Sequence, residues 1–80
     1  MVYRLEGKKV VGLKQTMKAI DNNSVKLVYL ANDAEEKIIK PVVNLLKDTN
    51  IEVLKVNSKE ELGAMCGIDV GAAIACVLKE

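Results

Sequence analysis

The stretch VKLVYLA at Val25–Ala31 decides the fold of this chain. It holds one charged residue, Lys26, and otherwise consists of aliphatic residues and Tyr29. A short, nearly continuous apolar run of this kind is typical of a buried strand. The stretch therefore predicts a sheet whose faces are covered by other elements.

Patterns on either side of this strand alternate between strand and helix. Further strands are predicted at residues 9–11, 51–56 and 72–78. Apolar residues recur at helical spacing from Leu13 to Ile20, from Ile38 to Leu46, and at Leu62 and Met65. Four strands separated by helices predict an α/β (α+β) fold, a three-layer α/β/α sandwich on a four-stranded sheet.

Local signals mark the ends of the second and third helices. Asp33 and Glu36 make a capping pair that we expect to start the second helix, and Ser58–Glu61 is a capping box for the third. Pro41 lies inside the second pattern and lacks a backbone N–H, so we expect it to kink that helix or to begin a second helical segment. Gly67 is expected to end the third helix.

Length and composition limit the size and chemistry of the domain. Eighty residues, half of them hydrophobic, suffice for one domain over residues 1–80 with one modest core. Without Trp or Phe the core must be aliphatic, and the aromatic platforms on which single-stranded bases stack are missing. Net charge is only +1, but residues 1–26 carry six basic and two acidic side chains. That basic end could bind a polyanion, although lysines on a solvated face are the commoner explanation of such a local excess of positive charge.

The residues that usually carry catalysis are scarce. Histidine is absent, which removes the usual general base and metal ligand. Ser24 and Ser58 occupy turn or cap positions, and Cys66 and Cys76 lack the spacing of a zinc pair. We therefore expect no enzyme, no cofactor, no metal and no small-molecule substrate, and two core thiols in a reducing compartment.

Features of export or membrane insertion are also missing from the pattern. The first residues lack the apolar run of a signal peptide. The uncharged run at residues 70–78 is too short to cross a bilayer. A cytoplasmic location without a membrane partner is the expectation.

The segment Gly12-Leu13-Lys14-Gln15-Thr16-Met17-Lys18 has two interpretations. In one, Gly12 makes an ordinary strand-to-helix turn and the lysines are solvated. In the other, the first free amides of the helix face a phosphate, while Lys14, Gln15 and Lys18 lie close to that end. Lysine donates to guanine O6 and N7, and a glutamine amide both donates and accepts on a base edge.

The segment Cys66-Gly67-Ile68-Asp69-Val70-Gly71 is equally open when taken alone. It could be a plain helix-to-strand connection in which glycines supply the turn. It is part of the longer stretch at residues 61–73. That stretch and residues 12–18 together resemble the two RNA-contacting segments of the kink-turn-binding ribosomal protein family of the L7Ae and L30e type, and in particular the small bacterial YbxF-type members. The resemblance covers nearly the whole chain, including the order of the elements.

The resemblance implies a mixed sheet and a set of RNA-contacting positions. Where archaeal and eukaryotic members have Gly-x-Asn-Glu, this chain has Gly12-Leu13-Lys14-Gln15, as in the bacterial branch. By resemblance, Ile68 and Val70 pack on the splayed bases of the bulge, and Glu35 and Ile39 flank an extruded nucleotide. The implied RNA-binding residues are Gly12, Leu13, Lys14, Gln15, Lys18, Glu35, Ile39, Ile68, Asp69 and Val70.

The resulting expectation is a non-catalytic, monomeric protein that binds kink-turns in structured RNA such as ribosomal RNA or riboswitches. A kink-turn is a bent duplex in which a bulge adjoins tandem G·A pairs. The alternative is a protein-interaction or ribosome-assembly module that keeps the fold without binding kink-turns. The near-neutral net charge favours that alternative.

Overall fold

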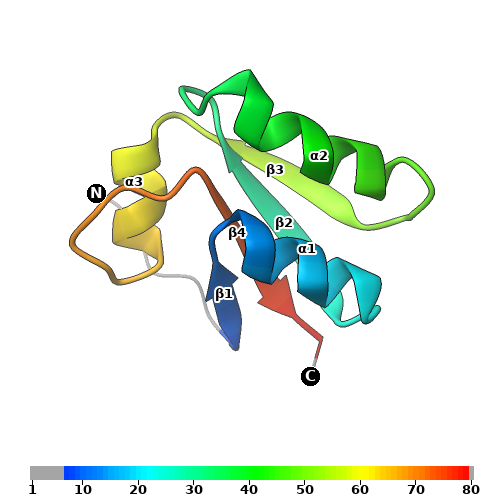
Figure 1. Cartoon of the computed structure of the whole chain (residues 1–80). Helices are drawn as coiled ribbons and strands as arrows, with labels where there is room; N and C mark the ends of the chain where they lie inside the picture. The colour runs from blue at the N-terminus through cyan, green and yellow to red at the C-terminus, as the bar shows by residue number, and fades with distance from the viewer. Residues whose placement is uncertain (1–6, 80) are drawn as a thin grey trace.

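The computed structural model describes residues 7–79 as a mixed sheet between helices. The elements are β1 (Lys9–Val11), α1 (Leu13–Asp21), β2 (Val25–Ala31), α2 (Glu36–Leu46), β3 (Glu52–Val56), α3 (Lys59–Met65) and β4 (Ile74–Leu78). In Figure 1, α1 and α2 lie on one side of the sheet and α3 on the other. The predicted three-layer α/β/α arrangement is confirmed.

The strands are ordered β1-β4-β2-β3, so β2 is an inner strand. Strand β4 pairs antiparallel with both β1 and β2, whereas β2 and β3 are parallel. One row across the sheet consists of Val10, Cys76, Val28 and Val53. The sheet is therefore mixed, as the family resemblance implied.

Two apolar clusters fill the spaces on the two faces of the sheet. Side chains alternate along β2: Val28 and Leu30 pack with α1 and α2, while Tyr29 packs with α3. Leu62 of α3 and Val42 of α2 are fully buried in these two clusters. The continuous apolar run of β2 is thus explained by a helix layer on each face.

The start of α2 corrects one prediction from the sequence. The cap residue of α2 is Glu35, and no side chain caps this helix. The Asp33 carboxylate instead accepts a hydrogen bond from the backbone N–H of Lys59, at 2.7 Å. Asp33 therefore contacts the start of α3, while the predicted cap at Ser58 is confirmed by its 3.0 Å bond from Glu61 N.

Three other differences from the prediction concern Pro41, the first residue of β4 and the burial of β3. Pro41 lies within the single helix α2 and does not begin a second helical segment. The predicted strand at 72–78 starts at Ile74. The alternation predicted for β3 does not match burial: Val53 is 37% exposed and only Val56 of this strand is buried. An edge strand has a neighbour on one side only, so its faces are less covered.

Both cysteines are free and buried, one in each apolar cluster, as predicted. Burial raises the pKa of the Cys66 thiol and of the Cys76 thiol above the ordinary value. The folded chain therefore favours the unreactive thiol form of both.

We expect iodoacetamide at pH 8 to alkylate the native protein roughly 100-fold more slowly than the unfolded chain. Because folding raises both pKa values, the two thiols should add no pH dependence to the stability below the ordinary thiol pKa of about 8.5 and should lower the stability as the pH rises above it. Mass spectrometry of timed samples measures the labelling. Rapid modification of Cys66 would place this thiol at the surface and contradict its burial.

Candidate nucleic-acid interface

Three segments that are distant in sequence meet at one edge of the sheet, namely the edge where β1 and β2 end and β4 begins. Gly12, between β1 and α1, donates its N–H to the carbonyl of Ile74 at 2.9 Å. Ala31, at the end of β2, donates to the carbonyl of Ala73 at 2.9 Å. The β1–α1 turn, the β2–α2 turn and the α3–β4 loop are therefore neighbours at this edge.

Gly12 permits the sharp entry into α1. Its φ of 105° lies in the region that side chains disfavour, although a Cβ there would meet nothing within 4 Å. The first intrahelical bond runs from Thr16 N to Gly12 O at 3.0 Å. The N–H groups of residues 13–15 therefore have no acceptor inside the helix, and its first turn contains no acidic residue. This helix start is suited to an anion.

Helix α1 buries its apolar face, so the polar residues that were predicted to bind RNA face solvent. Thr16, Ala19 and Ile20 are buried, whereas Lys14 and Gln15 are exposed and Lys18 is exposed one turn further on. Leu13 is half-buried against the core beneath α1 and α2. Among residues 7–79, neither of these two lysines forms an ion pair. Both ammonium groups are therefore available to a partner.

The second segment contributes Glu35 and Ile39 at the start of α2. The Glu35 carboxylate is exposed and forms a 3.3 Å ion pair with Lys37. Ile39 is half-buried and lines a cavity of about 190 Å³ together with Asn32 and Lys55. The structure thus places Ile39 beside a hollow at the same edge of the sheet.

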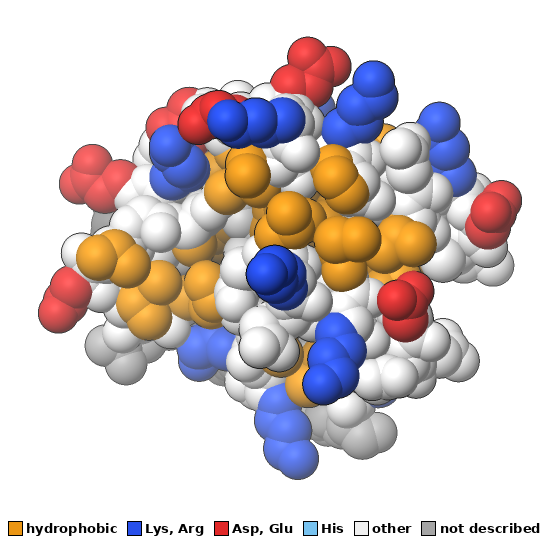
Figure 2. Space-filling view, in the orientation of Figure 1, with side chains coloured by type: hydrophobic (Ala, Val, Ile, Leu, Met, Phe, Trp, Pro, Cys, Tyr) orange, Lys and Arg blue, Asp and Glu red, His pale blue; other side chains and the backbone are white. Residues whose placement is uncertain are grey.

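The third segment presents apolar side chains to solvent. Gly67, with φ of 78°, ends α3, and the N–H of Ile68 donates to Gly63 O at 3.0 Å. Beyond this turn Ile68 is 36% exposed, Val70 is 70% exposed and Asp69 is exposed between them. Figure 2 shows several groups of hydrophobic side chains on this face of the molecule, with both basic and acidic side chains around them. Two exposed branched side chains in one short loop are suited to a contact surface.

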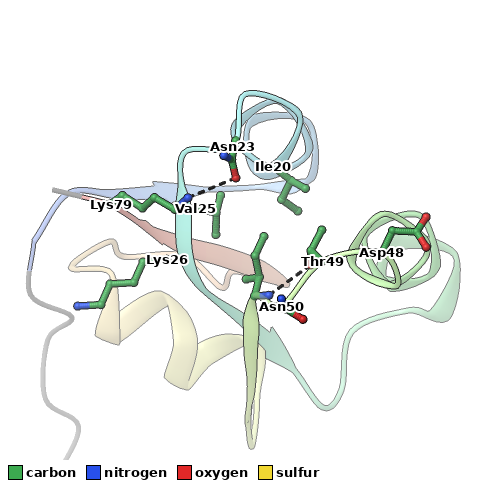
Figure 3. A pocket seen from close by; sticks show the side chains of 9 residues that line it. Ile20, Asn23, Val25, Lys26, Asp48, Thr49, Asn50 and Lys79 are labelled. Carbon is green, nitrogen blue, oxygen red and sulfur yellow. Dashed lines mark hydrogen bonds between the residues drawn. The ribbon is translucent and has the colours of Figure 1, made fainter.

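Nine of the ten residues predicted to bind RNA lie in or beside these three segments, whereas Lys18 lies in the last turn of α1, further from them. A cavity of about 480 Å³ lies at the opposite edge of the sheet and contains none of them (Figure 3). In that cavity Lys79 Nζ donates to Asn23 Oδ1 at 3.3 Å.

Within residues 7–79, no group of three His, Cys, Asp or Glu side chains could hold a metal ion, and no helix has the length and apolarity to cross a membrane.

Sequence reasoning missed the residues that hold the segments together. Asp33 and Lys59 join the β2–α2 turn to α3, and Gly63 lies under the α3–β4 loop. Gly63 carried a usable signal, because a glycine inside a helical pattern often marks a close approach of another backbone. The Asp33 bond to a residue 26 positions away carries no local signal.

Comparison with known proteins relates the chain to one family. The model of the "Ribosomal protein L7Ae/L30e/S12e/Gadd45 family" matches residues 3–80. An RNA-binding protein of Caldanaerobacter subterraneus subsp. tengcongensis is 48% identical over 75 residues, which cover 94% of this chain and 92% of that protein. The RNA-binding protein YbxF of Geobacillus stearothermophilus is 40% identical over 73 residues, 91% of this chain and 89% of its own.

Solved structures share the fold. A protein of unknown function from Bacillus halodurans superposes with a TM-score of 0.80 at 27% identity, over 89% of this chain and 71% of that one. The 15.5kD RNA binding protein of Giardia lamblia gives a TM-score of 0.83 at 23% identity, over 90% of this chain and 61% of that one, and supports the fold alone. The resemblance found in the sequence is confirmed: this chain belongs to the ribosomal protein L7Ae/L30e/S12e/Gadd45 family, among relatives of the bacterial YbxF type.

Proposed function

We propose that this chain is a non-catalytic RNA-binding protein that recognises kink-turns and stabilises their bent form. The observation that carries the proposal is the meeting of the open start of α1 with the exposed Ile68 and Val70 at one edge of the sheet. Similar proteins from Caldanaerobacter and Geobacillus bear the name of RNA-binding proteins, which supports the same class of partner.

The start of α1 would recognise the tandem G·A pairs. Its free amides face the backbone phosphates, and Lys14 and Gln15 reach the guanine edges. Lys18, exposed in the last turn of α1, would add a positive charge along the same helix. Positively charged and amide groups on one helix end thus combine positioning with base reading.

The α3–β4 loop would cover the bulge. Ile68 and Val70 pack on unstacked bases, and Asp69 between them offers an acceptor for an exocyclic amine or a 2′-hydroxyl. Ile39 and Glu35 flank a nucleotide that leaves the stack. Such contacts exist only in the bent RNA, so binding shifts its population toward that form.

The proposal also includes the cellular location, the oligomeric state and the type of RNA. We place the protein in the cytoplasm, acting as a monomer on ribosomal RNA or on a riboswitch. One protein surface that receives one kink-turn requires no second subunit.

The α1 contacts give the first test of this function. Lys14→Ala and Gln15→Ala should each weaken binding to a kink-turn RNA by about 1–3 kcal/mol, because each removes a base-edge contact. Melting temperatures should hardly change, since both side chains are exposed. Fluorescence anisotropy with a labelled kink-turn measures the affinity.

Lys47→Ala is the matched control for charge. Lys47 is exposed just after α2, at the other edge of the sheet, so its loss removes one charge without touching the interface. If Lys47→Ala and Lys14→Ala weaken binding equally, only overall charge matters and α1 does not read guanine edges.

A further inference from the structure

Lys59, the first residue of α3, joins two of the three segments of the interface through its backbone. Its N–H donates to Asp33 Oδ1 at 2.7 Å, and its carbonyl accepts from Ala72 N at 2.9 Å. Asp33 belongs to the β2–α2 turn and Ala72 closes the α3–β4 loop. One residue thus fixes these two segments relative to each other.

The α3–β4 loop also lies directly on α3. A Cβ built on Gly63 would come within 2.0 Å of the Val70 carbonyl oxygen, a separation that real Cβ atoms do not show. A Cβ on Gly71 would lie 3.1 Å from the Lys59 Cβ. The loop returns along the helix, and its chain passes beside α3 in Figure 1. Only glycine at position 63 leaves room for this backbone.

The loop therefore has a fixed backbone and free side chains. The backbone is held by two hydrogen bonds to α3, from Ile68 N to Gly63 O and from Ala72 N to Lys59 O, and between them the Val70 carbonyl lies against Gly63. The side chains of Ile68 and Val70 remain exposed. A surface held in its binding shape before contact loses less conformational freedom on binding.

We propose that Gly63 and Asp33 are positioning residues for RNA binding, which act through the loop and the turn that they hold against α3. This inference rests on the proposed function, since it names what prepares the same surface. Gly63 is buried beneath the loop and acts without touching RNA.

Gly63→Ala tests the loop contact. The added methyl group must displace the Val70 backbone, so we expect kink-turn binding to weaken by about tenfold or more, mainly through faster dissociation. The amides of Ile68 and Ala72 should exchange hydrogen faster, because their bonds to α3 loosen. Alanine favours a helix over glycine, so α3 itself should not weaken.

Ala64→Gly is the matched control in the same helix. Ala64 is exposed, and its truncation lowers helix propensity without adding an atom under the loop. We expect lower thermal stability, but an affinity within about twofold of the parent chain. If Ala64→Gly weakens binding as much as Gly63→Ala does, the effect is general stability and the positioning role is excluded.

Asp33 offers an independent test that does not depend on Gly63→Ala folding. Asp33→Asn and Asp33→Ala both remove the negative charge, but only asparagine keeps an oxygen that accepts from Lys59 N. Asparagine should bind kink-turn RNA at least as well as the parent, and alanine about 3- to 10-fold less well than asparagine. Equal affinities for these two variants would exclude a positioning role for the hydrogen bond.

Titration of the parent chain with the same kink-turn separates the two claims. If the parent does not bind it, the proposed function fails and this inference with it. If the parent binds but Gly63→Ala binds as tightly, with unchanged exchange at Ile68 and Ala72, the positioning inference alone is overturned.

Discussion

Replacing Ile68 and Val70 together by serine should weaken kink-turn binding by about 2–4 kcal/mol, through loss of the apolar area that these side chains bury on the RNA. Dissociation should become faster, because the bulge loses its cover after the complex has formed. The free energy of unfolding should change by less than about 1 kcal/mol, since both side chains are already exposed in the folded chain. A dissociation rate from surface plasmon resonance and a melting curve measure the two effects.

The double variant Val43→Ser/Val53→Ser provides the control. Val43 on α2 and Val53 on β3 are exposed to a degree similar to Ile68, but lie outside the three interface segments. Their replacement should leave the RNA affinity unchanged. If instead the Ile68/Val70 variant loses several kcal/mol of folding stability, the two side chains belong to the core and the loop does not bind RNA through them.

The fold could be predicted where the hydrophobic pattern of an element matches the way in which that element is buried. The bounds of β2 match the apolar stretch at Val25–Ala31, because an inner strand with helices on both faces needs apolar residues at successive positions. Strand β3 was predicted as a strand, but its burial was not, because its position at the edge depends on the whole topology.

The cap of α2 shows a limit of local reasoning. Asp33 and Glu36 have the spacing of a capping pair, yet the Asp33 carboxylate bonds to Lys59 across the interface. A short side chain in a turn has several possible partners, and sequence spacing reveals only those nearby.

The candidate site was predictable to different degrees at its different positions. For Lys14, Gln15 and Lys18, the glycine before a helix and the helical spacing left two interpretations open, and the family resemblance favoured RNA binding. The structure places all three side chains on exposed surface. Glu35 and Ile39 came from the family resemblance alone. A glycine inside a helix, such as Gly63, signals the close approach of another backbone, but only the path of the loop shows that this backbone is that of Val70.

Charge limits how the protein can bind RNA. With a net charge of +1, it can make few phosphate contacts, about 2–4, and each contributes roughly −0.7 to −0.9 to the slope of log K against log salt. The total slope should then be shallow, about −1.5 to −3.5. Most of the affinity must come from guanine edges, the covered bulge and the bent shape of the RNA.

One measurement tests kink-turn recognition most directly: the dissociation constants, at several salt concentrations, for a kink-turn RNA and for the same RNA with its tandem G·A pairs changed to Watson–Crick pairs. The change preserves the length and backbone charge, but removes the guanine edges and the tendency to bend. We expect it to weaken binding by about 1,000-fold or more, and we expect a shallow salt slope for the kink-turn. Equal affinity for the two RNAs, with a steep salt slope for both, would contradict kink-turn recognition and indicate a nonspecific binder of RNA.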